Sequence, residues 1–468
     1  MRRLLAALFA LVLLGLVEIA ARLVYVPDAG SPSPDGEVNP GGILLDGNPW
    51  LLWELVPGAH EELGTTVQVN ALGMRDRDRG PKTGRRALAL GDSSVYGWGV
   101  PDERVFTAVL EAETGEEFVN LAVPGHSSYQ QLNLLLMRGL ALDPDLLIVA
   151  NLWSDNNFDS FTDKELLASY AGWEASTGQR VRRLLEHSAV FRLLDWQLRV
   201  KPQGERARKV GWMLGGTDTR TGNRRVAIND YAANLEAFAR IMADRGGGVV
   251  YVILPNREDL ASGPADPAWG PYRRVMRETA ERWGAPLVDL PAVFEASGLD
   301  VKELVIDEMH PTVEGHRRMA VAIGEALAPG WPVLTEPSSP LPTYEDPYEG
   351  SGLEAAAGDR PDTSIPALRG TLTGDLRLPP GFQGRVLVDV RVPGDRAVLG
   401  QAVATGEGPL KILVPSVPEK VVVEVMHDRA GDGPTPGDPT AVLPEQPVGP
   451  DRALSLDFSG AKFTTGPR

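Results

Sequence analysis

Two short segments carry the residue types of a serine nucleophile and its base. Ser93 follows an apolar run in the Gly-Asp-Ser-Ser segment 91–94, and Asp307 and His310 lie three residues apart in the segment 307–311. A serine hydroxyl needs a base to take its proton, and a carboxylate fixes the tautomer of a histidine base. The spacing allows Asp307 to orient His310 toward Ser93. It equally allows a plain surface loop ahead of the helix expected over 313–327.

The elements around these segments alternate between strands and helices. Apolar runs typical of buried strands cover 87–90, 146–152, 248–254 and 286–290. Amphipathic segments such as 231–244 and 272–283 lie between them. This alternation predicts a parallel sheet covered by helices on both faces, and such sheets bind ligands at the carboxyl ends of their strands. Ser93 would then stand on a strand-to-helix turn, with backbone N–H groups near it.

The middle of the chain resembles the SGNH/GDSL hydrolase superfamily. The stretch 90–100 is similar to the first block of that family, 120–125 to the second, and 307–311, followed by Gly315 and His316, to the last. In addition, 69–75 resembles the lead-in of membrane-anchored members. The similarity covers about residues 45–330. It implies a flavodoxin-like three-layer α/β/α fold with a parallel sheet.

The resemblance also implies roles for individual residues. Ser93 is similar to the nucleophile of the family and His310 to its general base, with Asp307 orienting His310. The N–H groups of Ser93 and Gly125 would be two donors of an oxyanion hole. The family requires neither a metal nor a cofactor for this chemistry, so none is expected here.

The third block departs from the family pattern. The family ends its middle strand with Gly-x-Asn-Asp, whereas this chain has Leu-Trp-Ser-Asp-Asn-Asn at 152–157. Counting along the strand puts the asparagine slot on Ser154 or Asp155. A carboxylate beside an oxyanion would repel it unless protonated. We therefore expect a one-residue bulge that delivers Asn156 as the third donor, with Ser154 in the glycine place and Asn157 in the aspartate place.

The first residues have the features of a targeting segment. Arg2 and Arg3 precede an apolar run from Leu4 to Val17, and apolar residues resume after Glu18. Residues 1–27 are therefore expected to be an uncleaved signal-anchor or a cleaved signal peptide. The positive-inside rule then places the rest of the chain outside the cytoplasm.

Composition divides the remainder. Residues 28–45 are expected to be a linker, 46–330 the hydrolase domain, and 331–362 a second linker rich in Pro, Ser, Gly and acidic residues. Period-two apolar runs within 363–468 predict a small β-sandwich-like domain. Near 201–225 we expect an exposed insertion, and its Trp212 and Met213 are candidates for part of a lid.

Charge and composition exclude several partners and sites. The net charge of −17 repels phosphate backbones, so no nucleic acid partner is expected, and the absence of cysteine excludes thiolate chemistry. Asp428, Asp432 and Asp438 form a weak calcium candidate, with a plain Asp/Gly turn as the alternative. His126, beside Gly125, is expected to be a solvated loop histidine.

The sequence therefore predicts a membrane-anchored, extracytoplasmic serine esterase. Its substrate would be an O-acyl group on glycan or lipid. One alternative is an O-acetyltransferase that passes the acyl group to a sugar hydroxyl. The other is a glycan-binding module without catalysis, since the third block deviates. The oligomeric state, the acyl chain and the role of the C-terminal domain stay open.

Overall fold

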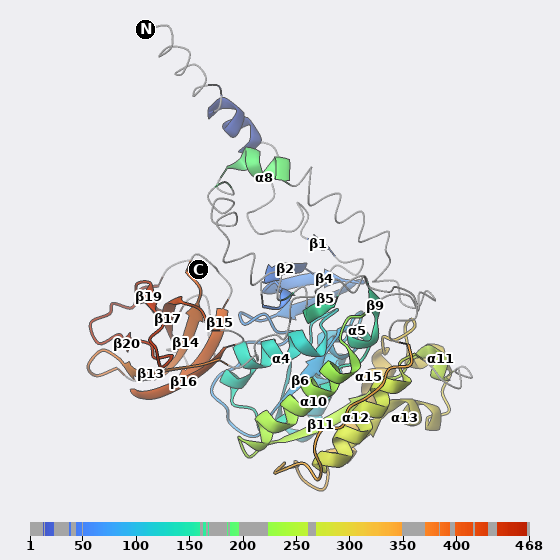
Figure 1. Ribbon diagram of the computed structural model, residues 1–468. Helices are drawn as coiled ribbons and strands as arrows, with labels where there is room; N and C mark the ends of the chain where they lie inside the picture. The colour runs from blue at the N-terminus through green and yellow to red at the C-terminus, as the bar shows by residue number, and fades with distance from the viewer. Residues whose placement is uncertain are drawn as a thin grey trace, which may run out of the picture.

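The part of the chain that the structure describes includes most of both expected domains. The computed structural model describes residues 13, 15–22, 37–38, 44–48, 50–159, 162–164, 167, 185, 188–195, 223–260, 268–348, 370–382, 384–393, 398–414, 417–428 and 438–465 (Figure 1). Most of the expected membrane segment, and Trp212 and Met213, lie outside these residues. Among the described residues, no helix combines the length and the apolar character needed to cross a membrane.

A five-stranded parallel sheet forms the centre of the larger domain. Its strands are β6 (Arg86–Gly91), β7 (Glu117–Asn120), β8 (Leu146–Ala150), β11 (Gly248–Ile253) and β12 (Leu287–Asp289), in the order β12-β11-β8-β6-β7. Taken in chain order, this is the flavodoxin-like arrangement. Strands β6, β8 and β11 are buried along their whole length, as expected for a sheet covered on both faces.

Helices cover both faces of this sheet and confirm the predicted three-layer fold. Helices α4 (Ser128–Met137), α10 (Ile228–Ala243) and α12 (Gly270–Trp283) pack together over one face (Figure 1). Helices α3 (Phe106–Thr114) and α15 (Val313–Leu327) pack together over the other. Right-handed crossovers account for this division, because the chain moves one way from β6 to β7 and the opposite way afterwards.

The strand order places a crevice at the carboxyl ends of β6 and β8. Strand β6 connects to β7 on one side and β8 connects to β11 on the other, so the connections that leave β6 and β8 diverge at this point. The short helix α2 (Ser93–Tyr96) follows β6, and α5 (Trp153–Asn156) follows β8. The first and third sequence blocks therefore meet at the carboxyl end of the sheet.

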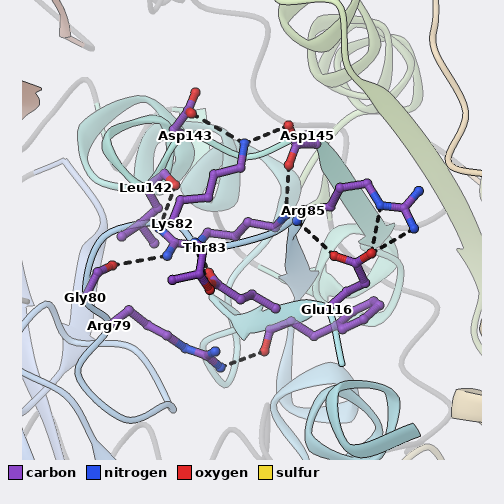
Figure 2. A network of polar contacts seen from close by, with 12 residues as sticks. Arg79, Gly80, Lys82, Thr83, Arg85, Glu116, Leu142, Asp143 and Asp145 are labelled. Carbon is purple, nitrogen blue, oxygen red and sulfur yellow. Dashed lines mark hydrogen bonds and ion pairs between the residues drawn. The ribbon is translucent and has the colours of Figure 1, made fainter. Parts of the chain in front are cut away.

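A polar network fixes the opposite, amino-terminal end of the same strands. Figure 2 shows Lys82 between Asp143 and Asp145, with its Nζ 2.7 Å from Asp145 Oδ1. The other oxygen of Asp145 accepts the backbone N–H of Arg86 at 2.8 Å, and the Arg86 guanidinium donates to the Leu142 carbonyl. These bonds tie the start of β6 to the loop before β8.

Two sheets form the C-terminal domain, which confirms the all-β prediction. One consists of β15 (Val398–Ala404), β14 (Arg385–Arg391), β17 (Lys420–Asp428) and β18 (Thr440–Val442), joined by antiparallel pairs, with β19 (Gln446–Pro447) also on β17. The other is ordered β16 (Gly408–Val414), β13 (Gly370–Arg377), β20 (Leu456–Asp457). Side chains such as Leu372, Val388 and Val423 make its separate core.

The β domain lies against one side of the α/β domain. Strands β15 and β16 contact α4, and β15 also contacts η2 (Gly139–Leu142) (Figure 1). Trp50 packs against the cores of both domains. It belongs to a region with short strands not expected from the sequence: β1 (Glu37–Val38), β2 (Leu44–Asn48), β3 (Leu52–Leu55), β4 (Gly58–Glu62) and β5 (Thr65–Val69).

The start of the expected second linker packs onto the α/β domain. Residues 331–348, which we call the strap, follow the helix after His310. Leu334 is buried, and the side chain of Asn229 exchanges two hydrogen bonds with the backbone of Tyr344. Residues 349–369 lie outside the described part. The sequence misses this because a Pro- and Ser-rich stretch with few apolar residues still docks through its backbone.

The calcium candidate receives no support from the described residues. Asp432 lies outside them, Asp428 and Asp438 are buried, and Asp428 pairs with Arg385 at 3.7 Å. No cluster of His, Asp and Glu suited to a metal ion occurs in the described part of the chain.

Candidate active site

The turn after β6 presents Ser93 at the start of α2. Asp92 caps this helix by accepting the N–H of Ser94 at 3.0 Å. A side chain at position 91 would clash, because a Cβ there would lie 2.3 Å from the Val95 side chain. Gly91 thus lets the chain turn sharply from strand to helix, and Ser93 stays partly exposed at the carboxyl edge of the sheet.

The loop that carries His310 is closed on itself and tied to the nucleophile turn. A bridge pairs Val305 with Pro311, and the N–H of Ile306 donates to the His310 carbonyl at 2.7 Å. Across the edge of the sheet, the hydroxyl of Ser94 donates to the Met309 carbonyl at 3.1 Å. This bond holds two segments together that are far apart in the sequence.

The structure brings Ser93, His310 and Asp307 into one hydrogen-bonded row. His310 Nε2 lies 2.7 Å from Ser93 Oγ, and His310 Nδ1 lies 2.7 Å from Asp307 Oδ2. The carboxylate favours the proton on Nδ1, which leaves Nε2 to accept from the serine hydroxyl. The ring of Trp98 packs on His310 with a centroid distance of 4.4 Å. This row has the arrangement of a serine nucleophile, its base and the group that orients the base.

Asp307 is held in its charged form. Partial burial opposes its ionisation, but the bonds from the His310 ring and from the N–H groups of Met309 and His310 lower its pKa to about 2. The carboxylate is therefore negative at neutral pH and would stabilise a positive imidazolium on His310.

The two backbone N–H groups expected to serve the oxyanion hole are those of Ser93 and Gly125. Within the described part of the chain, no acceptor bonds the N–H of Ser93 or that of Gly125. Gly125 follows β7 and has a φ of +78°, a conformation that favours glycine. The N–H groups are thus available for an oxygen that gains negative charge.

The third block differs from the prediction. No bulge occurs: residues 153–156 form the helical turn α5, in which the N–H of Asn156 donates to the Leu152 carbonyl. The side-chain amide of Asn156 donates to the same carbonyl at 2.6 Å, so it folds back on its own turn. The backbone N–H of Ser154, by contrast, donates to Asp92 Oδ2 at 3.2 Å and brings Ser154 next to the nucleophile turn.

The carboxyl group of Asp155 is bonded to the first residue of α4. Both of its carboxyl oxygens accept the N–H of Ser128, at 2.9 and 3.1 Å. Burial raises the pKa of Asp155 to about 7, although its bonds to Ser128 oppose the shift. The Asp155 carboxyl therefore has a structural partner in α4.

Buried residues near the site were missed or misread in the sequence. The exposed insertion expected up to residue 225 is wrong at its end, since Arg224 and Arg225 are buried. The expected solvated His126 is also wrong, because this residue is fully buried. Charge alone suggested a surface position, and no local pattern reveals the distant partners Asp346 and Asp163 that pair with the two arginines.

A family comparison agrees with this geometry. Residues 159–318 match the family model described as the GDSL-like Lipase/Acylhydrolase family. The matched segment, about a third of the chain, is similar to this family. It includes Asp307 and His310, whereas Ser93 precedes it and joins them through the hydrogen bond to His310. This match supports a hydrolase that acts on esters. No curated protein matches the chain.

Several solved structures resemble the chain distantly. An α/β hydrolase, LAE5, from the metagenome of Lake Arreo is 17% identical, covering 53% of this chain and 96% of its own, with a TM-score of 0.34. Axe2, an acetylxylan esterase from Geobacillus stearothermophilus, is 16% identical, covering 53% and 95%, with a TM-score of 0.33. A putative acylhydrolase from Bacteroides fragilis is 15% identical, covering 54% and 90%, with a TM-score of 0.32. Likenesses this weak say nothing about the substrate of this chain.

Proposed function

We propose that this protein is a serine esterase in which Ser93 attacks the carbonyl carbon of an O-acyl ester. The observation that carries the proposal is the continuous row from Ser93 Oγ through His310 to Asp307, with 2.7 Å at each bond. A serine alone is a weak nucleophile, and this row supplies both the base and its counter-charge.

The reaction follows from the positions of the three side chains. As Ser93 Oγ bonds to the carbonyl carbon, its proton passes to His310 Nε2, and the carbonyl oxygen becomes an oxyanion. The C–O bond to the alcohol then breaks, and the departing oxygen takes the proton from His310. Water then attacks the acyl carbon, and its proton passes to His310. The bond from this carbon to Ser93 Oγ breaks, and Ser93 takes the proton from His310.

The oxyanion would be held by the N–H groups of Ser93 and Gly125, with the hydroxyl of Ser154 as a third donor. Two observations support Ser154 over Asn156. The N–H of Ser154 is bonded to Asp92 beside the nucleophile, and the amide of Asn156 is bonded to Leu152. Each donor aimed at developing charge contributes about 100-fold to the rate.

Substrate and location form the less constrained part of the proposal. The apolar run after Arg2 and Arg3 supports a site outside the cytoplasm, where acylated glycans and lipids are the available esters. We infer such an O-acyl group as the substrate. Rates of acid release from acetylated oligosaccharides and from longer acyl esters test the choice of substrate. Measuring whether an added sugar receives the acyl group separates hydrolysis from transfer.

A fluorophosphonate tests the core of the proposal. It should inactivate the purified full chain, and mass spectrometry should find the adduct on the peptide that contains Ser93. The Ser93→Ala variant should stay unlabelled and should not hydrolyse p-nitrophenyl acetate. An active, unlabelled wild type, or an active Ser93→Ala variant, would exclude the serine esterase.

A further inference from the structure

The segment that carries the Gly125 N–H is held from two sides. The indole Nε1–H of Trp53 donates to the Pro124 carbonyl at 2.9 Å, and Arg225 Nη1 donates to the Gly125 carbonyl at 2.8 Å. Trp53 lies on β3, ahead of the parallel sheet, and Arg225 follows β10 (Asn223–Arg224), between β8 and α10. Two distant parts of the chain thus converge on consecutive peptide units of one loop.

We propose that Trp53 and Arg225 are positioning residues that set the direction of the Gly125 N–H. This inference rests on the proposed function, in which that N–H binds the oxyanion. It assigns to the region before the first block a part in the reaction, through the loop that it holds.

The bond from Trp53 controls this N–H through peptide geometry. The Pro124 carbonyl and the Gly125 N–H belong to the same peptide unit, and the described part of the chain has no cis peptide bond. In a trans peptide, C=O and N–H point in opposite directions. Fixing the Pro124 oxygen on Trp53 therefore fixes the N–H on the other side of the peptide. Rotation of this peptide would withdraw the donor.

The bond from Arg225 fixes the next peptide. The Arg225 guanidinium donates two hydrogen bonds to the Asp163 carboxylate, at 3.0 and 2.8 Å. The side chains of Arg225 and Asp163 are 3% and 0% exposed. It also bonds Gln130 Oε1 at 3.2 Å. A guanidinium locked in this way has no freedom to follow the loop, so the Gly125 carbonyl is held at a fixed place and with it the positive φ of Gly125.

The two positioning residues also support each other. The Arg225 guanidinium lies over the Trp53 ring at 5.7 Å from its centroid. His126 packs edge-on against the same ring at 5.7 Å, and its Nε2 lies 2.8 Å from the Trp53 carbonyl. Because the Gln131 amide donates to His126 Nδ1, the ring presents Nε2–H to that carbonyl. Burial lowers the pKa of His126 to about 3, so the ring stays neutral in this role.

Trp53→Phe tests the inference, because phenylalanine keeps an aromatic ring against Arg225 and His126 but has no N–H for Pro124. With p-nitrophenyl acetate we expect kcat to fall at least about tenfold, since loss of a whole oxyanion donor costs about 100-fold or more. KM should change less than about twofold. The pH profile of kcat should keep its shape, because the oxyanion donor does not titrate. Affinity for a trifluoromethyl ketone, which forms an oxyanion on Ser93, should fall in parallel with kcat/KM.

Trp50→Phe is the matched control. Trp50 lies in the same region and packs into the cores, and it has no part in the loop of Gly125. Its variant should keep kcat within about twofold of the wild type. Equal losses of kcat in the two variants, or a Trp53→Phe variant with unchanged kcat, would overturn the inference. A rise in KM alone would do so as well.

Arg225→Lys provides a second route if Trp53→Phe does not fold. Lysine keeps a positive charge for Asp163 but lacks the second arm that reaches the Gly125 carbonyl. We expect the same loss of kcat and of ketone affinity, and full activity in a folded Arg225→Lys variant would contradict the inference. If the wild type itself neither reacts with fluorophosphonate nor cleaves esters, the proposed function fails and this inference fails with it. An active wild type with an unaffected Trp53→Phe variant rejects the positioning role alone.

Discussion

The buried carboxylate of Asp92 accepts the backbone N–H of Ser154 at 3.2 Å. Through its other oxygen it accepts the N–H of Ser94, so one side chain joins the turn after β6 to the turn after β8. Burial raises the pKa of Asp92, and the N–H donors, together with the charge of His310, oppose that shift. The carbonyl group of the substrate would lie between these two turns. Ser154 would then be placed to donate to its oxygen.

Ser154→Ala should lower kcat on p-nitrophenyl acetate by about 10- to 100-fold if its hydroxyl is the third oxyanion donor. The melting temperature should hardly change, because the bond to Asp92 comes from the backbone of Ser154. Asn156→Ala should instead lower the melting temperature, since its amide bonds the Leu152 carbonyl. A larger loss of kcat in Asn156→Ala, without loss of stability, would assign the third donor to Asn156.

Ser93→Ala and His310→Ala should each remove nearly all turnover, and the double variant should lose little more. Residues that act as one unit give such non-additive losses, because the second substitution removes a partner that is already useless. Single-turnover rates for the three variants measure this directly. Additive losses would show that the two side chains act separately.

The pH dependence of activity should not contain the titration of Asp307. Its pKa is lowered to about 2, so it stays ionised from about pH 4 upward. A lowered carboxyl pKa stabilises the fold above the ordinary value of 3.8, and this contribution is lost as the pH falls from about 4 to 2. Asp307→Asn should reduce kcat by up to about 10⁴-fold at neutral pH, because the histidine loses its orientation and counter-charge. A variant with wild-type kcat at pH 7 would remove Asp307 from the mechanism.

Asp155 should make the fold less stable as the pH rises. Its pKa of about 7 lies above the ordinary value of 3.8, so between these values the folded protein keeps a proton that the unfolded chain has lost. The corresponding penalty is absent below about pH 4 and complete above about pH 7. Asp155→Asn removes this titration and should raise the melting temperature relative to wild type at pH 8 more than at pH 4. An equal difference at both pH values would contradict this expectation.

The sequence predicted those parts of the site that local pattern determines. Ser93 after a strand and glycine, and Asp307 three residues before His310, are short-range features, and the alternation of strands and helices predicts the sheet that brings the two together. The sequence did not predict the helical turn formed by 153–156, because residue types alone do not specify that turn, and the direction of the Asn156 side chain depends on it.

Long-range contacts explain the remaining errors. Arg225 looks like a surface charge in the sequence. Its pairing with Asp163 offsets the cost of removing the charge from water. The role of Trp53 is not visible in the sequence either, because its bond to Pro124 requires the folded loop. Both residues reach the site from segments outside the blocks that resemble the family.

The strap supports the active site through one buried ion pair. Asp346 binds Arg224 with 2.6 Å between Oδ2 and Nε, and their side chains are 0% and 1% exposed. Arg224 Nη1 in turn donates to the Asn156 carbonyl, so the strap is connected to the turn that carries Ser154. Removing one partner of a buried pair costs about 3–5 kcal/mol, because the other charge is left uncompensated.

Asp346→Asn should therefore lower both the free energy of unfolding and kcat, whereas Glu345→Gln, at an exposed neighbouring position, should change neither.

For the same reason, a chain that ends at residue 330 should be inactive or unfolded even though it contains Ser93 and His310. Proteolysis within 349–369 leaves the strap attached and should spare esterase activity. Urea titration and p-nitrophenyl acetate turnover measure both effects. Full stability and activity of the chain ending at residue 330 would show that the strap has no role in holding the Ser154 turn.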